Sequence, residues 1–384
     1  MKELNIALIG TKFMGKAHSN AWKKAPYFFD LASKPVLKVA CGQDEKALQE
    51  FAVRWGWEEI ETDWQKVVQR EDVDVVDISV PTHLHHRIAL AAAQAGKHIF
   101  CEKPMAVSFD QAKEMYEAAE RNGIKHYLNH NYRRTPAVML AKQLIEEGRI
   151  GRIFHWRGAY LQSWIVDPDF PLTWHLQKEF AGAGPQFDLN SHSVDLARFL
   201  VGEIKAVNCM TSRFIPERPL PGEGAGTFKS STGGGEMGEV GVEDAAFMLV
   251  EFENGALGSF EATRFAPGRK NYNYFEIYGS KGSLIFDLER MNELQFYSAE
   301  DPDHAQGFRT IMATEGSHAY IDHWWPPGHI IGYEHEFVHA VVDFIQAIAQ
   351  DGPIKPDFHD GMKLMQVLEA GLKSAQEGRK LVLS

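Results

Sequence analysis

The stretch LNIALIGTKFMG, residues 4–15, decides the fold of the first part of the chain. A short apolar run at residues 4–9 ends at Gly10, and Gly15 stands at the start of a helical pattern. A strand that enters a helix through such a turn is typical of dinucleotide-binding domains, where the first glycine permits the tight turn and the last lets the helix pack closely on the strand. Lys12 stands where the middle glycine of G-x-G-x-x-G would be. The turn alone therefore fits either a nucleotide site or an ordinary strand–helix connection.

The first 125 residues alternate strand and helix patterns. Apolar runs at residues 36–41, 73–80 and 98–101 predict three further strands, and helical patterns follow at 45–55, 64–69 and 109–122. Asp44, Asp63 and Ser108 are N-cap residue types placed directly before these helices. Strands that alternate with helices predict a parallel sheet with helices on both faces.

The pattern changes after about residue 150. Strands are expected at residues 151–162, 205–214, 242–252, 255–264, 272–278 and 283–287. Hairpin signals such as Asn254-Gly255 lie between them and predict a mostly antiparallel sheet, and so a second domain. Helices are expected at 188–200, 332–350 and 360–376, and residues 216–241, rich in Pro and Gly, are expected to form a mobile loop.

Composition narrows the classes of function. The chain has 384 residues, enough for two or three domains, and its 52 acidic and 40 basic residues give a formal net charge of −12 at pH 7. That balance disfavours nonspecific nucleic-acid binding, and no apolar run approaches the roughly 18 residues of a membrane span. The N-terminus lacks a signal-peptide pattern, and three widely spaced cysteines favour neither a disulfide framework nor a thiolate zinc site. We expect a cytoplasmic protein without membrane or nucleic-acid partners.

Five further motifs, taken in chain order, resemble one family. They are SVPTHLH (79–85), GKHIFCEKPMA (96–106), NYR (131–133), WH (174–175) and GPQFDLNSHSVD (184–195). With the glycine turn they resemble the glucose–fructose oxidoreductase / inositol dehydrogenase family (GFO/IDH/MocA) over residues 4 to about 200. The E-K-P element and the later D-x-x-x-H are the most specific parts. The glycine turn most resembles the branch that contains levoglucosan dehydrogenase.

The resemblance implies an α/β fold and an activity. An N-terminal Rossmann NAD(P)-binding domain, residues 1–125, would precede a C-terminal α/β domain, residues 126–384, with an open, mostly antiparallel sheet and closing helices for substrate binding and oligomerisation. The implied activity is the NAD(P)-dependent, reversible oxidation of a ring secondary hydroxyl of a sugar, anhydrosugar or inositol to a ketone. A homodimer or homotetramer is expected by the same analogy. Two rival functions stay open: a redox-neutral NAD-dependent glycosidase acting through a 3-keto intermediate, and a non-catalytic nucleotide-sensing binding protein.

Such an oxidation needs a base for the hydroxyl proton, because the cofactor takes only the hydride. Lys103 is one candidate, since it follows a predicted parallel strand at the edge where open α/β sheets bind ligands. His192 is the other, because a histidine shuttles protons near neutral pH. Asp188 lies four residues earlier, on the same face if one helix carries both, and would bind a substrate hydroxyl or hold the imidazole. Which of Lys103 and His192 takes the proton first stays open at this stage.

The implied cofactor residues lie mainly after the predicted strands. Asp44 would hold the adenosine ribose or only cap the next helix, and no arginine follows it, which favours NAD while leaving NADP open. Glu102 would orient Lys103 or contact the nicotinamide ribose. His175 stands where many relatives have arginine. The full set is Gly10, Lys12, Phe13, Met14, Gln43, Asp44, Ser79, Pro81, Thr82, His85, Glu102, Lys103, Asn131, Trp174 and His175.

Other polar and aromatic residues are weaker candidates for contact with the substrate. They are Arg133, Gln162, Trp164, Asn190 and Tyr333. Residues 335–339 spell H-E-x-x-H, a zinc-protease pattern, but no third ligand is evident. We therefore expect no metal site, and a helix there whose polar face meets solvent or borders the substrate cleft.

Overall fold

A computed structural model describes residues 2–222 and 235–383. The chain divides into two compact units. The first contains Met1–Arg134, His323–Trp325 and Ile331–Lys363, and the second contains Thr135–Asp322, Pro326–Ile330 and Leu364–Ser384. This division differs from a single boundary near residue 125, because a segment close to the C-terminus returns to the first unit.

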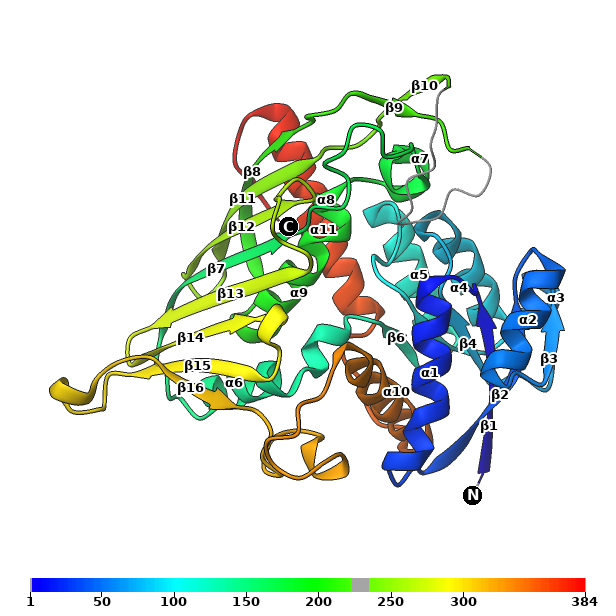
Figure 1. Ribbon diagram of the computed structural model, residues 1–384, viewed down its shortest axis with the longest axis horizontal. Coiled ribbons are helices and arrows are strands. Elements are labelled where there is room, and N and C mark those ends of the chain that lie inside the picture. Colours follow the sequence, from blue (N-terminus) through cyan, green and yellow to red (C-terminus); the bar gives the residue numbers. More distant parts are fainter. Residues whose placement is uncertain (1, 223–234, 384) are drawn as a thin grey trace. The chain divides into compact units, whose positions relative to one another are not determined.

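The first unit is built on a six-stranded parallel sheet with the order β3-β2-β1-β4-β5-β6 (Figure 1). Its strands are β1 (Lys2–Ile9), β2 (Ser33–Cys41), β3 (Glu59–Glu61), β4 (Val75–Ile78), β5 (His98–Cys101) and β6 (His126–Leu128). The four strands predicted from apolar runs are confirmed. The sequence pattern missed β3 and β6, which are only three residues long. This order is that of a Rossmann fold, and its direction reverses between β1 and β4, where such sheets bind ligands.

The helix starts predicted at residues 45, 64 and 109 are confirmed. The helices of the first unit connect or flank its strands. They are α1 (Phe13–Phe28), α2 (Glu45–Trp55), α3 (Trp64–Val68), α4 (His85–Gln94), α5 (Phe109–Arg121) and α10 (Tyr333–Gln350). The side chains of Asp44, Asp63 and Ser108 accept hydrogen bonds from the first turns of α2, α3 and α5. Because strand–helix–strand crossovers are right-handed, the reversal at β1 and β4 places α1 and α2 on one face and α4 and α5 on the other. Helix α10 packs beside α1 through buried residues such as Phe344, whose ring lies 6.5 Å from that of Trp22.

The second unit is built on a nine-stranded sheet with the order β16-β15-β14-β13-β7-β12-β11-β8-β17. The strands are β7 (Ile153–Leu161), β8 (Ile204–Ser212), β11 (Ala245–Phe252), β12 (Leu257–Thr263), β13 (Tyr272–Gly279), β14 (Gly282–Asp287), β15 (Glu293–Ser298), β16 (Arg309–Met312) and β17 (Leu381–Val382). Only β7 and β12 pair in parallel, so the prediction of a mostly antiparallel sheet is confirmed. The sequence pattern missed β15, β16 and β17.

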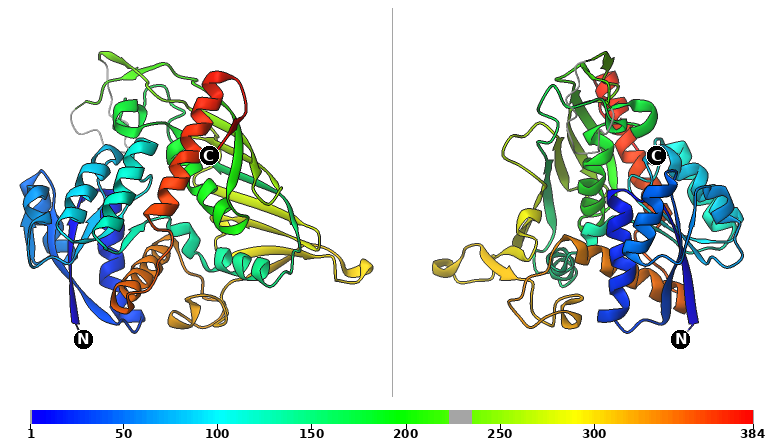
Figure 2. Two further views of the ribbon diagram at one scale, coloured as in Figure 1. Left: turned by 180° about the vertical axis from the view of Figure 1, so that it is seen from behind. Right: turned by 45° about the vertical axis from the view of Figure 1, so that its right-hand side comes forward.

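Helices cover one face of this second sheet (Figure 2). They are α6 (Pro136–Glu146), α8 (Pro185–Asp188), α9 (Asn190–Leu200) and the later part of α11 (Phe358–Glu377). In α11, Ser374 accepts a hydrogen bond from the backbone N–H of Cys209 in β8. On the other face, outward side chains such as Met210 and Leu249 remain exposed, by 76% and 62%.

The segment expected to be a loop, residues 216–241, is only partly irregular. Its ends form a two-stranded ribbon, β9 (Glu217–Pro219) paired with β10 (Met237–Glu239), so the prediction is wrong there. The reason is Arg218, whose fully buried guanidinium donates to the carbonyl oxygens of Ile165, Asp167 and Phe170. The predicted mobility of residues 223–234 falls outside the described residues. Within the described ranges, no helix combines the length and the apolar character needed to cross a membrane.

Candidate active site

The glycine turn between β1 and α1 is too tight for a side chain at either glycine. Gly10 has φ 108°, and a Cβ there would lie 2.5 Å from the carbonyl oxygen of Ser79. A Cβ on Gly15 would lie 2.1 Å from the carbonyl oxygen of Gly10, to which the Ser79 hydroxyl also donates at 2.9 Å. Lys12 has φ −80°, which every residue type adopts. The missing middle glycine therefore leaves the turn undisturbed.

The N-terminus of α1 suits a diphosphate. Lys12, the N-cap, makes no side-chain capping bond, and the first turn, which begins with Phe13 and Met14, contains no acidic residue. The first N–H groups of a helix lack partners within the helix and carry partial positive charge. This chain thus offers uncapped donors, a lysine and a close backbone approach at one place, which fits the anionic centre of a dinucleotide.

The loop after β2 carries Gln43 and Asp44, both exposed. The Asp44 carboxylate accepts a hydrogen bond from the N–H of Ala47 at 3.0 Å. Capping of α2 is therefore the role of Asp44 that the structure displays, and contact with a ribose stays a prediction.

The loop after β4 is tied to the loop after β5 by His85. Its fully buried ring lies between the carbonyl oxygens of Val80, 2.8 Å from Nε2, and Pro104, 3.0 Å from Nδ1. Burial lowers the pKa of His85, so a neutral ring donates to one carbonyl at a time. Pro81 and the buried Thr82 complete this loop. His85 therefore braces the ligand edge of the sheet from within.

Glu102 and Lys103 follow β5 at the same edge. Glu102 is buried, and its two carboxylate oxygens accept from the Lys103 backbone N–H at 3.2 Å, from Asn129 at 2.6 Å and from His18 at 2.8 Å. Burial alone would raise the pKa of Glu102, but the hydrogen bond and charge of His18 and the charge of Lys103 outweigh it and lower that pKa. Glu102 is thus ionised, and both of its carboxylate oxygens already accept hydrogen bonds from the protein. This favours a role in orienting Lys103 over contact with a ribose.

Residues after β6 meet the start of α10. The Asn131 amide donates to Glu336 at 3.0 Å, and Arg133 is buried beside it in a single 3₁₀ turn. Tyr333, the first residue of α10, stacks toward Phe13 with ring centroids 6.5 Å apart and an interplanar angle of 10°. The structure therefore brings a predicted substrate residue, Tyr333, next to the predicted cofactor turn.

The H-E-x-x-H pattern lies at the start of α10; Glu336 and His339 are buried, and His335 is partly exposed. His339 is fully buried; its Nδ1 donates to the carbonyl oxygen of Arg134 at 2.9 Å, and its Nε2 accepts from Trp324 at 2.8 Å. Glu336 is also fully buried. The expectation of a polar face toward solvent or a cleft is wrong for Glu336 and His339, because Asn131, Trp324 and the carbonyl oxygen of Arg134 satisfy these two side chains within the first unit. Both ring nitrogens of His339 are engaged by the protein, so this helix does not present a pair of histidines to a metal.

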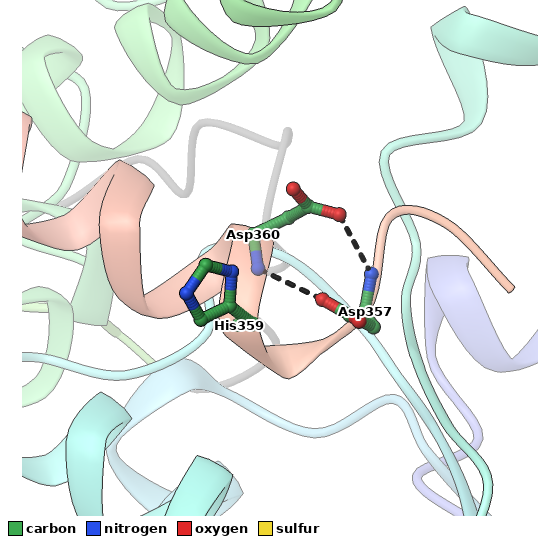
Figure 3. A group of neighbouring side chains, drawn as sticks. All are labelled: Asp357, His359 and Asp360. Atoms are coloured by element: carbon green, nitrogen blue, oxygen red, sulfur yellow. Dashed lines mark hydrogen bonds between the residues drawn. The ribbon is translucent and has the colours of Figure 1, made fainter. Parts of the chain in front are cut away.

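A second group of acidic and histidine side chains occurs at the start of α11 (Figure 3). Asp357 and Asp360 each accept a hydrogen bond from the other's backbone N–H, at 2.9 and 3.2 Å. Lys355 lies 2.8 Å from Asp357 and 3.4 Å from Asp360, and His359 is adjacent. These carboxylates form a reciprocal helix cap neutralised by a lysine, which accounts for the cluster without a metal.

In the second unit, predicted residues gather around Arg264, which the sequence reasoning missed. This buried guanidinium donates to Asp188 at 2.6 Å and lies 5.1 Å from the ring centroid of Trp164. Trp164 in turn donates to Gln162 at 2.7 Å. Three of the predicted residues therefore share one cluster. The sequence did contain an indication of this residue: Arg264 is a charged residue at the end of the strand predicted at 255–264, directly after a buried run.

The helix predicted at 188–200 is confirmed as α9 from Asn190 to Leu200, but its predicted start at Asp188 is wrong. Helix α8 ends at Asp188 and α9 begins at Asn190. The carbonyl oxygen of Leu189 accepts from both His192 at 3.1 Å and Ser193 at 3.5 Å, so the hydrogen-bond ladder changes register between the two helices. Asp188 and His192 thus stand on either side of a helix junction rather than one turn apart on a regular helix.

The remaining predicted residues of the second unit are Asn190, His192, Trp174 and His175. The buried His192 ring is 5.7 Å from that of Tyr160 in β7. Asn190 is fully buried and donates to Gln186 at 2.8 Å, a contact within the helical layer. Trp174 and His175 stack with ring centroids 3.7 Å apart, and His175 lies 5.6 Å from Trp164.

The parallel 3-2-1-4-5-6 sheet with its uncapped glycine turn defines the first unit as a nucleotide-binding unit of the Rossmann class. Comparison with known proteins agrees: residues 4–130 match the family model described as oxidoreductase family, NAD-binding Rossmann fold, and residues 138–285 match the GFO/IDH/MocA C-terminal domain. The chain belongs to the GFO/IDH/MocA family, as the motifs indicated, and it is an NAD-dependent oxidoreductase.

Relatives extend over the whole chain. Levoglucosan dehydrogenase of Pseudarthrobacter phenanthrenivorans is 47% identical over 98% of this chain and 97% of its own length. A solved structure of levoglucosan dehydrogenase in complex with NADH and levoglucosan has a TM-score of 0.94 and 44% identity, with full coverage of both chains. Myo-inositol 2-dehydrogenase of Thermotoga maritima is 23% identical over 99% of this chain and 98% of its own length.

Proposed function

We propose that this oxidoreductase oxidises a ring secondary hydroxyl of an anhydrosugar of the levoglucosan type to a ketone, with NAD as the hydride acceptor. The observation that carries the proposal is the 47% identity to levoglucosan dehydrogenase over nearly the full length of both chains. Each unit also supplies polar groups of the kind that the reaction needs: Lys103 at the ligand edge of the parallel sheet, and, in the second unit, His192 and the Asp188 carboxylate held by Arg264.

The chain's own residues divide the work. When bound, NAD accepts the hydride from the substrate carbon. Lys103 or His192 accepts the hydroxyl proton. Asp188, held by Arg264, accepts a hydrogen bond from a neighbouring substrate hydroxyl, and Trp164 offers an aromatic face to the apolar side of the sugar ring. Phe13 and Tyr333 border the nucleotide turn.

The test is NADH formation, followed by its absorbance, with levoglucosan, glucose and myo-inositol, each offered with NAD and with NADP. Levoglucosan with NAD should give the highest kcat/KM, by about tenfold or more over the other pairs. A clear preference for an inositol would contradict the substrate assignment. NADH binding without turnover on any polyol, or release of an aglycone from glycosides without net NADH, would contradict the dehydrogenase and favour a binding protein or a redox-neutral glycosidase.

We also propose a homo-oligomer that pairs through the open face of the second sheet. Met210, Phe247 and Leu249 point outward from the adjacent strands β8 and β11 and are 76%, 49% and 62% exposed. They surround a shallow hollow of about 550 Å³ whose floor also carries Arg157 and Glu276. An apolar centre with flanking charges of both signs is self-complementary in a two-fold pairing.

The proposed compartment is the cytoplasm. Cys41, Cys101 and Cys209, all three cysteines of the chain, are buried and unbridged, and burial raises the pKa of each thiol. Recovery of the activity in the cytoplasmic fraction of the native cells would agree with this proposal, and recovery outside the cell would contradict it.

A further inference from the structure

A chain of buried polar groups runs through the first unit behind the ligand edge of its sheet. His18, in α1, is fully buried; its Nδ1 lies 2.7 Å from a carboxylate oxygen of Asp77, and its Nε2 lies 2.8 Å from one of Glu102. The second oxygen of Asp77 accepts from Trp22 at 2.6 Å. Asp77 is itself a fully buried residue of the central strand β4. In the sequence, Asp77 stands within an otherwise apolar strand. A buried charge requires a partner, so this position indicated a buried polar group elsewhere in the unit.

The geometry makes His18 an imidazolium. An ionised carboxylate only accepts hydrogen bonds, so a ring that faces carboxylates on both sides must donate from both nitrogens. Burial alone would lower the pKa of His18, but the charges and hydrogen bonds of Asp77 and Glu102 outweigh it and raise that pKa to about 10. His18 therefore stays cationic at neutral pH.

Among the groups around His18, Glu102 is the one that contacts Lys103 at the ligand edge of the sheet. The rings of Phe100 in β5 and Phe337 in α10 pack against the imidazole, with centroids 5.3 and 5.7 Å away. The Asn129 amide lies 3.2 Å from Nε2. The adjacent Cys101 thiol has a pKa raised well above its usual value by burial and is uncharged. The other carboxylate oxygen of Glu102 faces the backbone N–H of Lys103, 3.2 Å away.

Glu102 transmits the position of His18 to Lys103. Its carboxylate is held by α1 through His18 and by the segment after β6 through Asn129, and its second oxygen accepts from the backbone N–H of Lys103. A buried ion pair contributes little net stability, because desolvation offsets most of the attraction. The buried charges of His18, Asp77 and Glu102 are therefore better explained by their effect on the position of Lys103 than by a gain in stability.

We propose that His18 is a positioning residue: as a buried cation between Asp77 and Glu102, it holds the Glu102 carboxylate ionised and fixed against the backbone of Lys103, and so sets the place of the Lys103 amine. This inference rests on the proposed function, with Lys103 as the group that takes the hydroxyl proton. His18 itself contacts neither substrate nor cofactor.

A double-mutant cycle tests the link. The variants are His18→Gln, Glu102→Gln and the double variant, with kcat, KM and the Kd for NADH measured for each. Because a small displacement of a reacting group lowers turnover strongly, His18→Gln should lower kcat by about 100-fold while the Kd for NADH changes by less than about threefold. If His18 acts through Glu102, the double variant should be no slower than Glu102→Gln alone. Independent, multiplying losses would overturn the proposal.

Trp22→Phe is the matched control. It removes a buried hydrogen bond to the same Asp77 but leaves the contact between His18 and Glu102 in place. We expect a loss of Tm comparable to that of His18→Gln, with kcat within about threefold of the native value. An equal fall in kcat for both variants would show that loss of stability, not placement of Lys103, explains the effect.

Two further measurements test the proposal: the protonation of His18 and the activity of Lys103→Ala. In the native protein, ¹⁵N NMR should show both ring nitrogens of His18 protonated at pH 8, and a neutral ring would overturn the proposal even if His18→Gln fails to fold. Lys103→Ala separates the two levels of the argument. If it abolishes turnover while His18→Gln does not affect it, the positioning role fails and the proposed function stands. If Lys103→Ala keeps near-native turnover, the roles of both Lys103 and His18 fail, while NADH formation with levoglucosan still tests the proposed function separately.

Discussion

At the scale of single residues, the candidate site depends on how each charged group is held. Lys103 leaves β5 beside a carboxylate that is already engaged by His18 and Asn129. Asp188 is held by Arg264, whose guanidinium is also buried against Trp164. In both places a group proposed to touch substrate or cofactor is oriented by a buried partner of opposite charge. Removing a partner should therefore change catalysis more than folding.

Lys103→Ala should lower kcat by at least about 100-fold, because proton transfer by a positioned side chain contributes this much. The Kd for NADH should change by less than about threefold, since the uncapped turn at α1 is untouched. Steady-state kinetics and NADH fluorescence titration measure the two quantities. Lys113→Ala, at an exposed lysine of α5, is the control and should be neutral. Near-native turnover of Lys103→Ala would contradict the assignment.

Arg264→Met should act mainly on the substrate. It keeps an unbranched apolar side chain but removes the guanidinium that lies over Trp164 and leaves Asp188 without its cation. We expect KM for the sugar to rise by about tenfold or more while the Kd for NADH is unchanged. Arg213→Met, at an exposed arginine paired with Glu239, is the control. An unchanged KM would show that the cluster around Arg264 is not a substrate site.

At the scale of elements, the strands and helices that a local pattern defines are those that the sequence predicted. The helix that starts after Asp44 matches its predicted bounds, 45–55, because a capping aspartate and an amphipathic stripe mark both start and length. The short strands β3 and β6 have only three residues and no period to detect. The junction between α8 and α9 was missed because Leu189 has an ordinary helical backbone conformation, and nothing in its residue type marks a change of register.

Gly15→Ala should separate α1 from β1. The added Cβ would lie 2.1 Å from the carbonyl oxygen of Gly10, so the helix start must shift, at a cost of about 2 kcal/mol of stability. The helix donors would move with it, and we expect NADH to bind at least about tenfold more weakly. Thermal unfolding and NADH titration measure these effects. Gly352→Ala, where an added Cβ meets nothing within 4 Å, should change neither.

The buried His339 of α10 predicts a loss of stability in acid. Burial lowers its pKa to about 3, whereas the unfolded chain binds a proton near pH 6.5, so its contribution is complete above about pH 6.5 and is lost as the pH falls toward 3. At pH 5 this linkage amounts to about 2 kcal/mol. Between pH 7 and pH 5, Tm should therefore fall less in His339→Gln than in the native protein. His304→Gln, at an exposed histidine, should follow the native curve.

At the scale of the whole molecule, the open sheet face of the second unit is the main feature without a partner in one chain. Leu249→Glu would place a carboxylate at the centre of the exposed apolar group formed with Met210 and Phe247. We expect the mass in solution, measured by light scattering, to fall from that of an oligomer to that of one chain. Val53→Glu, at a similarly exposed residue of α2, should not change the mass. A native protein that is already a monomer would contradict the proposed interface.

The sequence by itself determined the family, the Rossmann unit and the antiparallel second sheet, since each depends on patterns that are local in the chain: a glycine turn, alternating strands and helices, hairpin turns and the E-K-P motif. Only the tertiary structure revealed that Arg264 joins Asp188, that Glu336 and His339 of the H-E-x-x-H pattern are buried, and that His18 lies between Asp77 and Glu102. The partners of His18 are 59 and 84 residues away along the chain. No local pattern records such a pairing, because the free energy of burying a charge is decided by whichever distant group the fold brings beside it.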